Sequence, residues 1–204
     1  MAILDFWFEF ASTYSYPAAM RIGSAVKGTG VNVRWRPFLL GPIFKAQGWD
    51  NSPFNIFSAK GRYMWRDIER ECKIYGLPFR KPDPFPQPSL LAARIAACGT
   101  SEPWGEDFVR AVYRAEFADG RQIGEPDVIT AILEELGIDA ASVLIRAQSA
   151  ANKALLRRAT AEALERGIFG APTFITEDGE MFWGNDRLEQ AIAWAKGRRG
   201  ALRA

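Results

Sequence analysis

The 204-residue chain contains no histidine. Without an imidazole group it cannot form a Ser-His-Asp or Cys-His nucleophile, and it cannot bind a metal ion through histidine. Acid–base catalysis near neutral pH also loses its most common participant. Any catalytic activity must therefore depend on other side chains, on backbone groups or on a bound cofactor.

Cysteine is almost as scarce, since Cys72 and Cys98 are the only two in the sequence. They are too far apart for a C-x-x-C redox pair, and two thiols are too few for a thiolate zinc site. Cys72 continues the apolar positions Ile68 and Tyr75 at helical offsets, and Cys98 lies three residues after Ile95. The pattern favours buried thiols in helix faces, and no metal site is expected.

The sequence also lacks a long apolar segment and a large charge excess. No stretch approaches the about 18 consecutive apolar residues of a membrane-spanning helix, and the first residues do not have the pattern of a signal peptide. A formal net charge of +2 gives little support for binding of nucleic acid. These absences predict a cytoplasmic protein with no membrane or nucleic-acid partner.

The first 40 residues predict a strand, a helix and a second strand. Residues 2–10 alternate and are rich in aromatics, which is typical of a buried strand. Residues 12–17 provide capping residues and a proline suited to a first helical turn, followed by helix formers up to residue 26. Residues 31–36 alternate again. Such a unit normally has parallel strands joined by a right-handed crossover.

The middle of the chain predicts helices and loops only. Residues 41–58 are rich in Gly, Pro and Asn and are expected to form a loop, and the prolines between residues 78 and 88 require an extended segment. Apolar periodicity predicts the helices, at residues 59–75, 89–98, 106–117, 126–136, 140–150 and 151–166.

The end of the chain returns to strands. Residues 171–175 and 181–183 predict two short strands around a turn, and residues 187–196 predict a terminal helix. With the first part, this is the layout of an α/β protein with a thioredoxin-like domain, ordered βαβ and ββα, that is interrupted by an all-helical insertion. The predicted domains are residues 1–40 with 168–204, and residues 41–167.

In a thioredoxin-like layout the reactive group lies after the first strand, at the N-terminus of the first helix. Backbone N–H groups and the helix dipole favour an anion there. This sequence has Ser12 at that place. Helix capping alone also accounts for a serine, so a catalytic and a structural interpretation remain open.

Four stretches spread along the chain carry a resemblance to a known family. They are residues 5–16 (DFWFEFASTYSY), 60–67 (KGRYMWRD), 169–174 (FGAPTF) and 182–188 (FWGNDRL). In this order they resemble the 2-hydroxychromene-2-carboxylate isomerases, a DsbA-like family close to the kappa-class glutathione transferases. The sequence departs from the commoner family opening at Thr13, where proline is frequent.

The resemblance implies glutathione as the cofactor and Ser12 as the catalytic residue. The Ser12 hydroxyl would donate a hydrogen bond to the glutathione sulfur and so favour its thiolate. Pro172 would be a cis proline facing the Ser12 turn, and the backbone of Ala171 would pair with the cysteinyl part of glutathione. A proline at the start of an edge strand can equally be a structural feature.

The resemblance also assigns residues to the two ends of glutathione. Asn185 and Asp186 would hold the γ-glutamyl end, and Lys60 with Asn51 would bind the glycyl carboxylate. The structural alternatives are an N-cap of the last helix for Asn185 and a solvated lysine for Lys60. A lysine at a helix N-terminus opposes the helix dipole, which mildly favours the ligand role.

An aromatic substrate would need a pocket between the two predicted domains. Phe85 and Trp183 are candidates to stack on it, and Lys45 and Asn55 are candidates to bind its carboxylate or hydroxyl group. The implied reaction converts 2-hydroxychromene-2-carboxylate, or a related aromatic keto acid, to trans-o-hydroxybenzylidenepyruvate. The implied assembly is a homodimer.

Two other functions remain open. A kappa-like glutathione transferase or peroxidase would use the same thiolate but consume it, so turnover stoichiometry separates it from an isomerase. A non-catalytic DsbA-like protein that binds extended peptides or a partner would show no saturable binding of glutathione. The fold alone does not decide between these functions.

Overall fold

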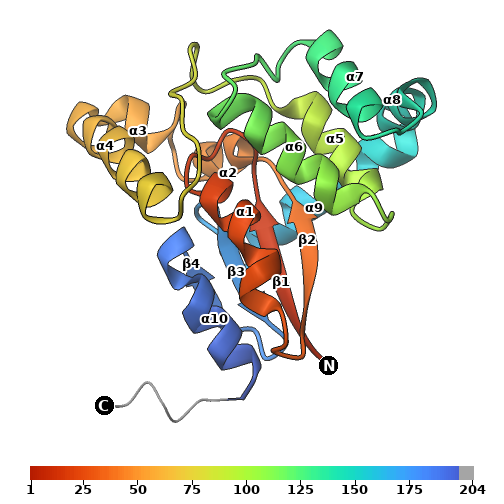
Figure 1. Ribbon diagram of the computed structural model, residues 1–204. Helices are drawn as coiled ribbons and strands as arrows, with labels where there is room; N and C mark the ends of the chain where they lie inside the picture. Colours follow the sequence, from red (N-terminus) through yellow and green to blue (C-terminus); the bar gives the residue numbers. More distant parts are fainter. Residues whose placement is uncertain (198–204) are drawn as a thin grey trace.

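The fold is built on a mixed four-stranded sheet (Figure 1). A computed structural model describes residues 1–197. The strands are β1 (Ala2–Phe8), β2 (Val31–Pro37), β3 (Thr173–Thr176) and β4 (Met181–Trp183), in the spatial order β2-β1-β3-β4. β1 and β2 are parallel, whereas β3 is antiparallel to both β1 and β4. The predicted α/β thioredoxin-like fold class is thereby confirmed.

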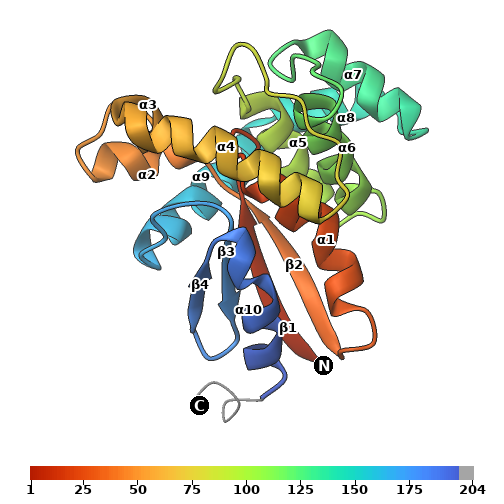
Figure 2. The same cartoon turned by 60° about the vertical axis from the view of Figure 1, so that its left-hand side comes forward.

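The alternation of side chains along β1 gives the sheet two apolar faces. Phe6 and Phe8 belong to the larger core cluster, with side chains of α1 and α10, whereas Trp7 belongs to a smaller cluster that includes Ala163 of α9. Helices therefore cover both faces, as Figures 1 and 2 show. The elements concerned are α1 (Ser15–Val26), α9 (Ala150–Glu165), and α10 (Leu188–Ala195) with the preceding 3-10 turn η1 (Asn185–Arg187).

The remaining helices lie at the end of the sheet where β1 finishes. Figures 1 and 2 show α3 and α4 on one side of the molecule and α5 to α8 on the other. The bounds are α2 (Leu40–Ala46), α3 (Pro53–Ile56), α4 (Ser58–Ile74), α5 (Leu90–Gly99), α6 (Gly105–Phe117), α7 (Pro126–Glu135) and α8 (Ala140–Gln148).

The expectation of a loop over residues 41–58 is wrong, because α2 and α3 lie there. In α3 the Ser52 side chain accepts a hydrogen bond from the N–H of Phe54, and Pro53 is the first helical residue. In α2, Gly41 and Pro42 lie in the first turn, where a missing N–H costs no hydrogen bond. The residues that suggest a loop here begin two short helices instead.

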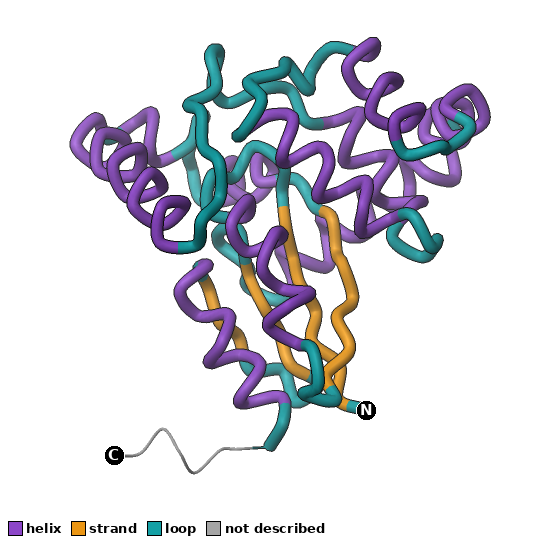
Figure 3. Tube along the Cα trace, viewed as in Figure 1, coloured by secondary structure: helices purple, strands orange, loops and turns teal. Residues whose placement is uncertain are grey.

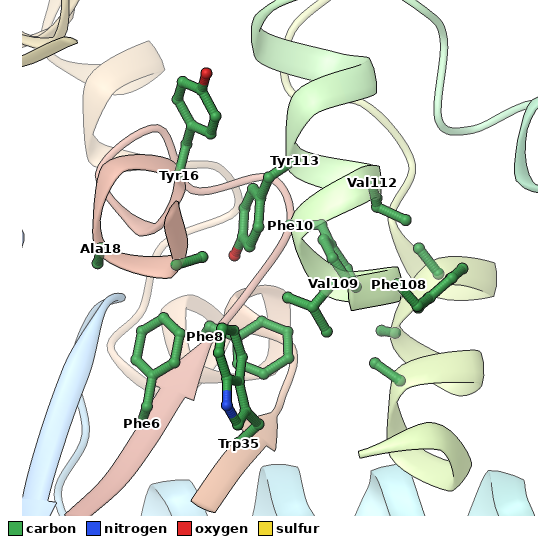
Figure 4. Close-up of a cluster of buried hydrophobic side chains, with 14 of the residues drawn as sticks. Phe6, Phe8, Phe10, Tyr16, Ala18, Trp35, Phe108, Val109, Val112 and Tyr113 are labelled. Carbon is green, nitrogen blue, oxygen red and sulfur yellow. The ribbon is translucent and has the colours of Figure 1, made fainter. Parts of the chain in front are cut away.

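A cluster of aromatic side chains joins the sheet to the helical segment (Figure 4). The ring centroids of Phe8 and Phe10 lie 6.3 and 5.1 Å from that of Tyr113 on α6, and Trp35 of β2 packs edge-on against Phe8. The two predicted domains thus share a core. That the helical segment is a separate domain stays a prediction, and residues 198–204 of the other one lie outside the described residues.

The proline-rich segment between α4 and α5 forms the long loop seen in Figure 3. The Tyr16 hydroxyl donates to the carbonyl oxygen of Pro78 (2.7 Å), and the side-chain oxygen of Gln87 accepts from the N–H of Ile123 (2.6 Å). These bonds hold the loop against α1 and against the chain that precedes α7. Residues 77–89 contain neither helix nor strand, and residues 83–86 form bends, so the extended conformation expected from the prolines stays a prediction.

Cys72 and Cys98 are buried free thiols, as the helical spacing predicts. Burial raises the pKa of the Cys72 thiol to about 12, so it stays protonated near neutral pH. Within residues 1–197, no group of three or more His, Cys, Asp or Glu side chains could hold a metal ion. None of the helices described there is long and apolar enough to cross a membrane.

Candidate active site

A cavity of about 750 Å³ opens where the sheet meets the helices. The end of β1 and the turn into α1 form one wall, and α2, α3 and the start of α4 form another. Residues 85–89 of the proline-rich loop, Leu90 at the start of α5, residues 169–171 and Trp183 complete it. The volume is within the range of small-molecule sites.

Ser12 lies in the wall of this cavity, at the turn between β1 and α1. Its hydroxyl accepts a hydrogen bond from the N–H of Ser15, the first residue of α1, at 3.3 Å. That bond satisfies a free N–H at the start of α1, although the N-cap residue itself is Tyr14, whose side chain makes no capping bond. The hydroxyl also donates to the carbonyl oxygen of Ala171 (2.8 Å), which capping does not require. Ser12 therefore combines a hydrogen bond to the first residue of α1 with a polar contact inside the cavity.

Ala171 and Pro172 lie next to Ser12, where β3 begins. The peptide bond between them is cis, as the resemblance implies. The Pro172 carbonyl accepts from the N–H of Gly184 (3.0 Å), which holds the chain after β4 beside the start of β3. Ala171 lines the cavity and pairs with Ser12, so two segments far apart in the sequence meet at this point.

Glu9 is an ionisable group of the cavity that the sequence analysis missed. It is 4% exposed, and its carboxyl group accepts a hydrogen bond from the hydroxyl of Ser89. Its carbonyl oxygen accepts from the N–H of Ser12 (3.0 Å) and from the hydroxyl of Tyr113 (2.9 Å). Burial raises the pKa of Glu9 to about 7, although hydrogen bonds to the carboxylate oppose this. A lone acid in the apolar run of residues 6–11 is the sequence signal that could have found it.

Glu116 of α6 is a second buried acid that interacts with Glu9. Burial, and then the charge of Glu9, raise the pKa of Glu116 well above its ordinary value. Neither of its carboxyl oxygens has a hydrogen-bond partner in the described part of the chain. Both effects disfavour the ionised form of Glu116, and Glu116 does not line the cavity.

Four further predicted site residues line the cavity, and these are Asn51, Lys60, Phe85 and Trp183. The Lys60 ammonium group is exposed and lies 5.0 Å from the centroid of the Phe57 ring. Trp183 is 49% exposed, so its indole is available at the rim. The structure thus brings the candidates for the glycyl carboxylate and for the aromatic ring to the same cavity as Ser12.

Besides Pro172, four predicted residues are not in the cavity lining found within residues 1–197. Lys45 is exposed near the end of α2, and Asn55 of α3 lines a smaller cavity of about 360 Å³. Asp186 is exposed, with its Oδ2 atom 3.6 Å from Nη2 of Arg187. Because successive residues of a helix point about 100° apart, the helical backbone directs Lys45 and Asn55 differently from their cavity-lining neighbours Phe44 and Phe54.

Asn185 is buried in a polar network instead of being open to a ligand. Its side-chain oxygen accepts from Nη1 of Arg21 (2.8 Å), and its side-chain nitrogen donates to Oε2 of Glu71 (2.5 Å). Arg21 also pairs with Glu189 and lies 3.6 Å from the centroid of the Tyr75 ring. The network ties η1 to α1 and α4, and the Asn185 side chain makes no helix-capping hydrogen bond.

Comparisons with known proteins agree with this geometry. A family model for a DSBA-like thioredoxin domain matches residues 3–192. The chain is 30% identical to a 2-hydroxychromene-2-carboxylate isomerase of Sphingobium xenophagum over 187 residues, 91% of this chain and 94% of that protein. It is 26% identical to glutathione S-transferase kappa 2 of Caenorhabditis elegans, with 92% and 89% covered. A solved 2-hydroxychromene-2-carboxylate isomerase has a TM-score of 0.85 at 28% identity, with 96% and 95% covered.

The chain therefore belongs to the DsbA-like thioredoxin-domain family. Within that family it is similar, over almost its whole described length, to proteins named isomerases and kappa-class transferases. The resemblance found in four short stretches of the sequence is confirmed.

Proposed function

We propose that the protein is a glutathione-dependent isomerase of 2-hydroxychromene-2-carboxylate or a related aromatic keto acid. The observation that carries this proposal is the Ser12 hydroxyl, paired with the Ala171 carbonyl in the wall of a cavity with many apolar residues. The similarity to proteins of that name supports the substrate class.

Glutathione fits the polar groups at this point of the cavity. A cysteinyl residue offers a backbone N–H donor and a sulfur acceptor. Ser12 and Ala171 offer the complementary donor and acceptor, which are 2.8 Å apart and satisfy each other. The Ala171 carbonyl can accept the cysteinyl N–H, and the freed Ser12 hydroxyl can then donate to the sulfur. The exchange leaves no buried polar group without a partner.

Ser12 and the start of α1 stabilise a thiolate. The N–H groups and the dipole at the helix N-terminus favour a negative charge, and the Ser12 hydroxyl adds a charge-assisted hydrogen bond. Each unit by which a thiol pKa falls from about 8.5 corresponds to about 1.4 kcal/mol, so one or two such donors are enough. When bound, glutathione supplies the thiolate that adds reversibly to the conjugated substrate and lets one carbon–carbon bond rotate.

The remaining candidate residues bind glutathione and orient the aromatic substrate. Lys60 and Asn51 hold the glycyl carboxylate, and Asp186 holds the γ-glutamyl ammonium group beside η1. Phe85 and Trp183 flank the aromatic ring. The side chain of Asn185 is engaged with Arg21 and Glu71, so its part is to support this end of the site. Lys45 and Asn55 as contacts for the substrate carboxylate or hydroxyl stay predictions.

A kappa-like glutathione transferase or peroxidase is the second candidate, and the full-length similarity to a kappa-class transferase favours it. It would use the same cavity and the same Ser12. The amount of reduced glutathione before and after turnover distinguishes the two, because an isomerase regenerates its cofactor whereas a transferase or peroxidase consumes it. A non-catalytic DsbA-like binding protein would bind no glutathione saturably.

The proposal also covers location and assembly. The cytoplasm is the compartment that fits a protein that depends on reduced glutathione. A homodimer is supported by exposed apolar side chains on α3 and α4, including Ile56 and Tyr63. Light scattering tests the assembly.

The experiment that tests the function is Ser12→Ala, with Thr13→Val as the matched control. Both variants remove one hydroxyl group from the same buried turn of the cavity wall. At saturating glutathione, Ser12→Ala is expected to lower kcat by roughly tenfold to a thousandfold, the range for one lost donor to a developing anion. Thr13→Val should stay within about threefold of the unmodified protein. An unchanged kcat in Ser12→Ala would overturn the proposal.

A further inference from the structure

The cavity contains few ionisable groups, and these are Glu9, Tyr14, Asp50 and Lys60. Asp50 and Lys60 are exposed, and Tyr14 donates its hydroxyl proton to Asp67 (2.9 Å). Burial raises the pKa of Tyr14 as well, so it does not titrate near neutral pH. Glu9 is the buried member of this set, and the proposed contacts with glutathione do not involve it.

Glu9 and the Ser12–Ala171 pair belong to different parts of the cavity wall. The Ser12 hydroxyl points to Ala171, whereas the Glu9 carboxyl group meets Ser89 at the end of the proline-rich loop. Phe85 and residues 86–90 also line the cavity, on the stretch of chain that contains Ser89. A substrate that lies against Phe85 and is attacked from the Ser12 side therefore has Glu9 as its neighbouring acid.

Resting on the proposed function, we propose that Glu9 is a catalytic proton donor, whose neutral carboxyl group protonates the keto oxygen of the aromatic substrate and later takes the proton back. Addition to the conjugated double bond moves an electron pair onto that oxygen. The O–H bond of Glu9 breaks, an O–H bond forms on the substrate, and the electron pair of the broken bond stays on the Glu9 carboxylate. When the carbonyl group re-forms, the proton returns to Glu9, so the cycle consumes none.

The surroundings of Glu9 suit a group that must both give and accept a proton. Tyr113 and Glu116 face it from α6 and Ser89 from the residue before α5, and none of these described groups is cationic. Burial places its pKa at about 7, close to the value at which a carboxyl group exchanges protons best near neutral pH. The chain has no histidine to fill this role.

The test is Glu9→Gln, which keeps the shape of the side chain but carries no exchangeable acid proton. With saturating glutathione, kcat for the isomerisation is expected to fall at least about 100-fold, while the dissociation constant of glutathione stays within about twofold. In the unmodified protein kcat should also fall as the pH rises through about 7, because Glu9 loses its proton there. Glu9→Gln should lack this decline.

Glu116→Gln is the matched control, because it makes the same replacement at a buried carboxyl group that does not line the cavity. It should keep kcat within about threefold and keep the decline above pH 7. A spectroscopic readout is independent of activity. The infrared difference between the unmodified protein and Glu9→Gln should contain a protonated-carboxyl band that disappears as the pH passes about 7.

Ser89→Ala provides a second variant if Glu9→Gln does not fold. The Ser89 hydroxyl lowers the pKa of Glu9, so its removal should move the decline in kcat to higher pH. A decline that does not move would overturn the proposal, as would a Glu9→Gln protein with kcat within threefold of the unmodified one. In both cases the isomerase itself would still be active. If the unmodified protein does not isomerise the substrate at all, the proposed function fails first and the role of Glu9 with it.

Discussion

The two main walls of the cavity are held in place in different ways. The wall at the end of β1 continues directly into the aromatic cluster of Phe8, Phe10 and Tyr113, all of which are fully buried. The wall formed by α2 and α3 has little core of its own, since Ile43 is the buried residue of α2 and α3 has none. Ser12 and Glu9, the proposed reacting groups, thus belong to the firmly packed wall. The less tightly packed wall of α2 and α3 shapes the space for a ligand.

Replacing one phenylalanine in each wall with alanine gives the strongest test of this difference. Phe10→Ala removes a buried ring from the first wall and is expected to lower the free energy of unfolding by about 3 to 5 kcal/mol. Phe54→Ala removes a half-buried ring from the second wall and should cost less than about 1.5 kcal/mol. Urea unfolding followed by circular dichroism measures both. Equal losses would mean that the two walls are equally part of the core.

The buried acid of the first wall predicts an unusual dependence of stability on pH. The pKa of Glu9 rises from 4.5 to about 7 on folding, so the folded chain binds this proton more tightly than the unfolded chain. The free energy of unfolding then decreases as the pH rises from 4.5 to 7, by about 1.4 kcal/mol per unit. Between pH 5 and pH 8 the contribution is about 3 kcal/mol.

The comparison with Glu9→Gln isolates this contribution from those of other carboxyl groups. Glutamine does not titrate, so the stability of the variant relative to the unmodified protein should increase by about 3 kcal/mol from pH 5 to pH 8. Urea unfolding at both pH values measures the difference. A constant difference between the two proteins would show that Glu9 is ionised like an exposed acid.

Two glycine-to-alanine substitutions test how closely the helices of the second wall pack against each other. A Cβ at Gly61 of α4 would lie 2.3 Å from the carbonyl oxygen of Phe54, whereas a Cβ at Gly41 of α2 meets nothing within 4 Å. Gly61→Ala should therefore push α3 away from α4 and cost about 1 to 3 kcal/mol. Gly41→Ala should be neutral or stabilise the protein by up to about 1 kcal/mol. Thermal unfolding measures the stability of both variants. If Gly61→Ala were as stable as the unmodified protein, α3 would have to move freely relative to α4.

Local patterns in the sequence were enough for much of the fold. The alternation of residues 2–10 and 31–36, with the capping residues between them, predicts the parallel pair and the helix that follows the first strand. These signals work because each one reports on neighbours along the chain. The segment 41–58 misled the prediction, because glycine and proline are equally suited to loops and to the first turn of a helix.

In the candidate site, too, some features follow from the local sequence and others do not. The place of Ser12 follows from the order of the elements, since a serine between the first strand and the first helix must lie at a helix N-terminus. The contact of Ser12 with Ala171, 159 residues away, needed the family resemblance to be anticipated. Lys45 and Asn55 lie on α2 and α3, two helices that the sequence did not predict, and neither side chain is in the Ser12 cavity lining found within residues 1–197. Their contacts with the substrate stay predictions.

The amino-acid sequence alone excludes imidazole chemistry, indicates a βαβ start and a ββα end, and has a hydroxyl group where a thioredoxin-like fold favours an anion. Only the tertiary structure decided that Glu9 meets Ser89, 80 residues away, and that Asn185 is engaged with Arg21 and Glu71. The physical reason is that periodicity and capping depend on near neighbours. Burial, and with it the pKa of an acid, depends on segments that approach one another only when the whole chain has folded.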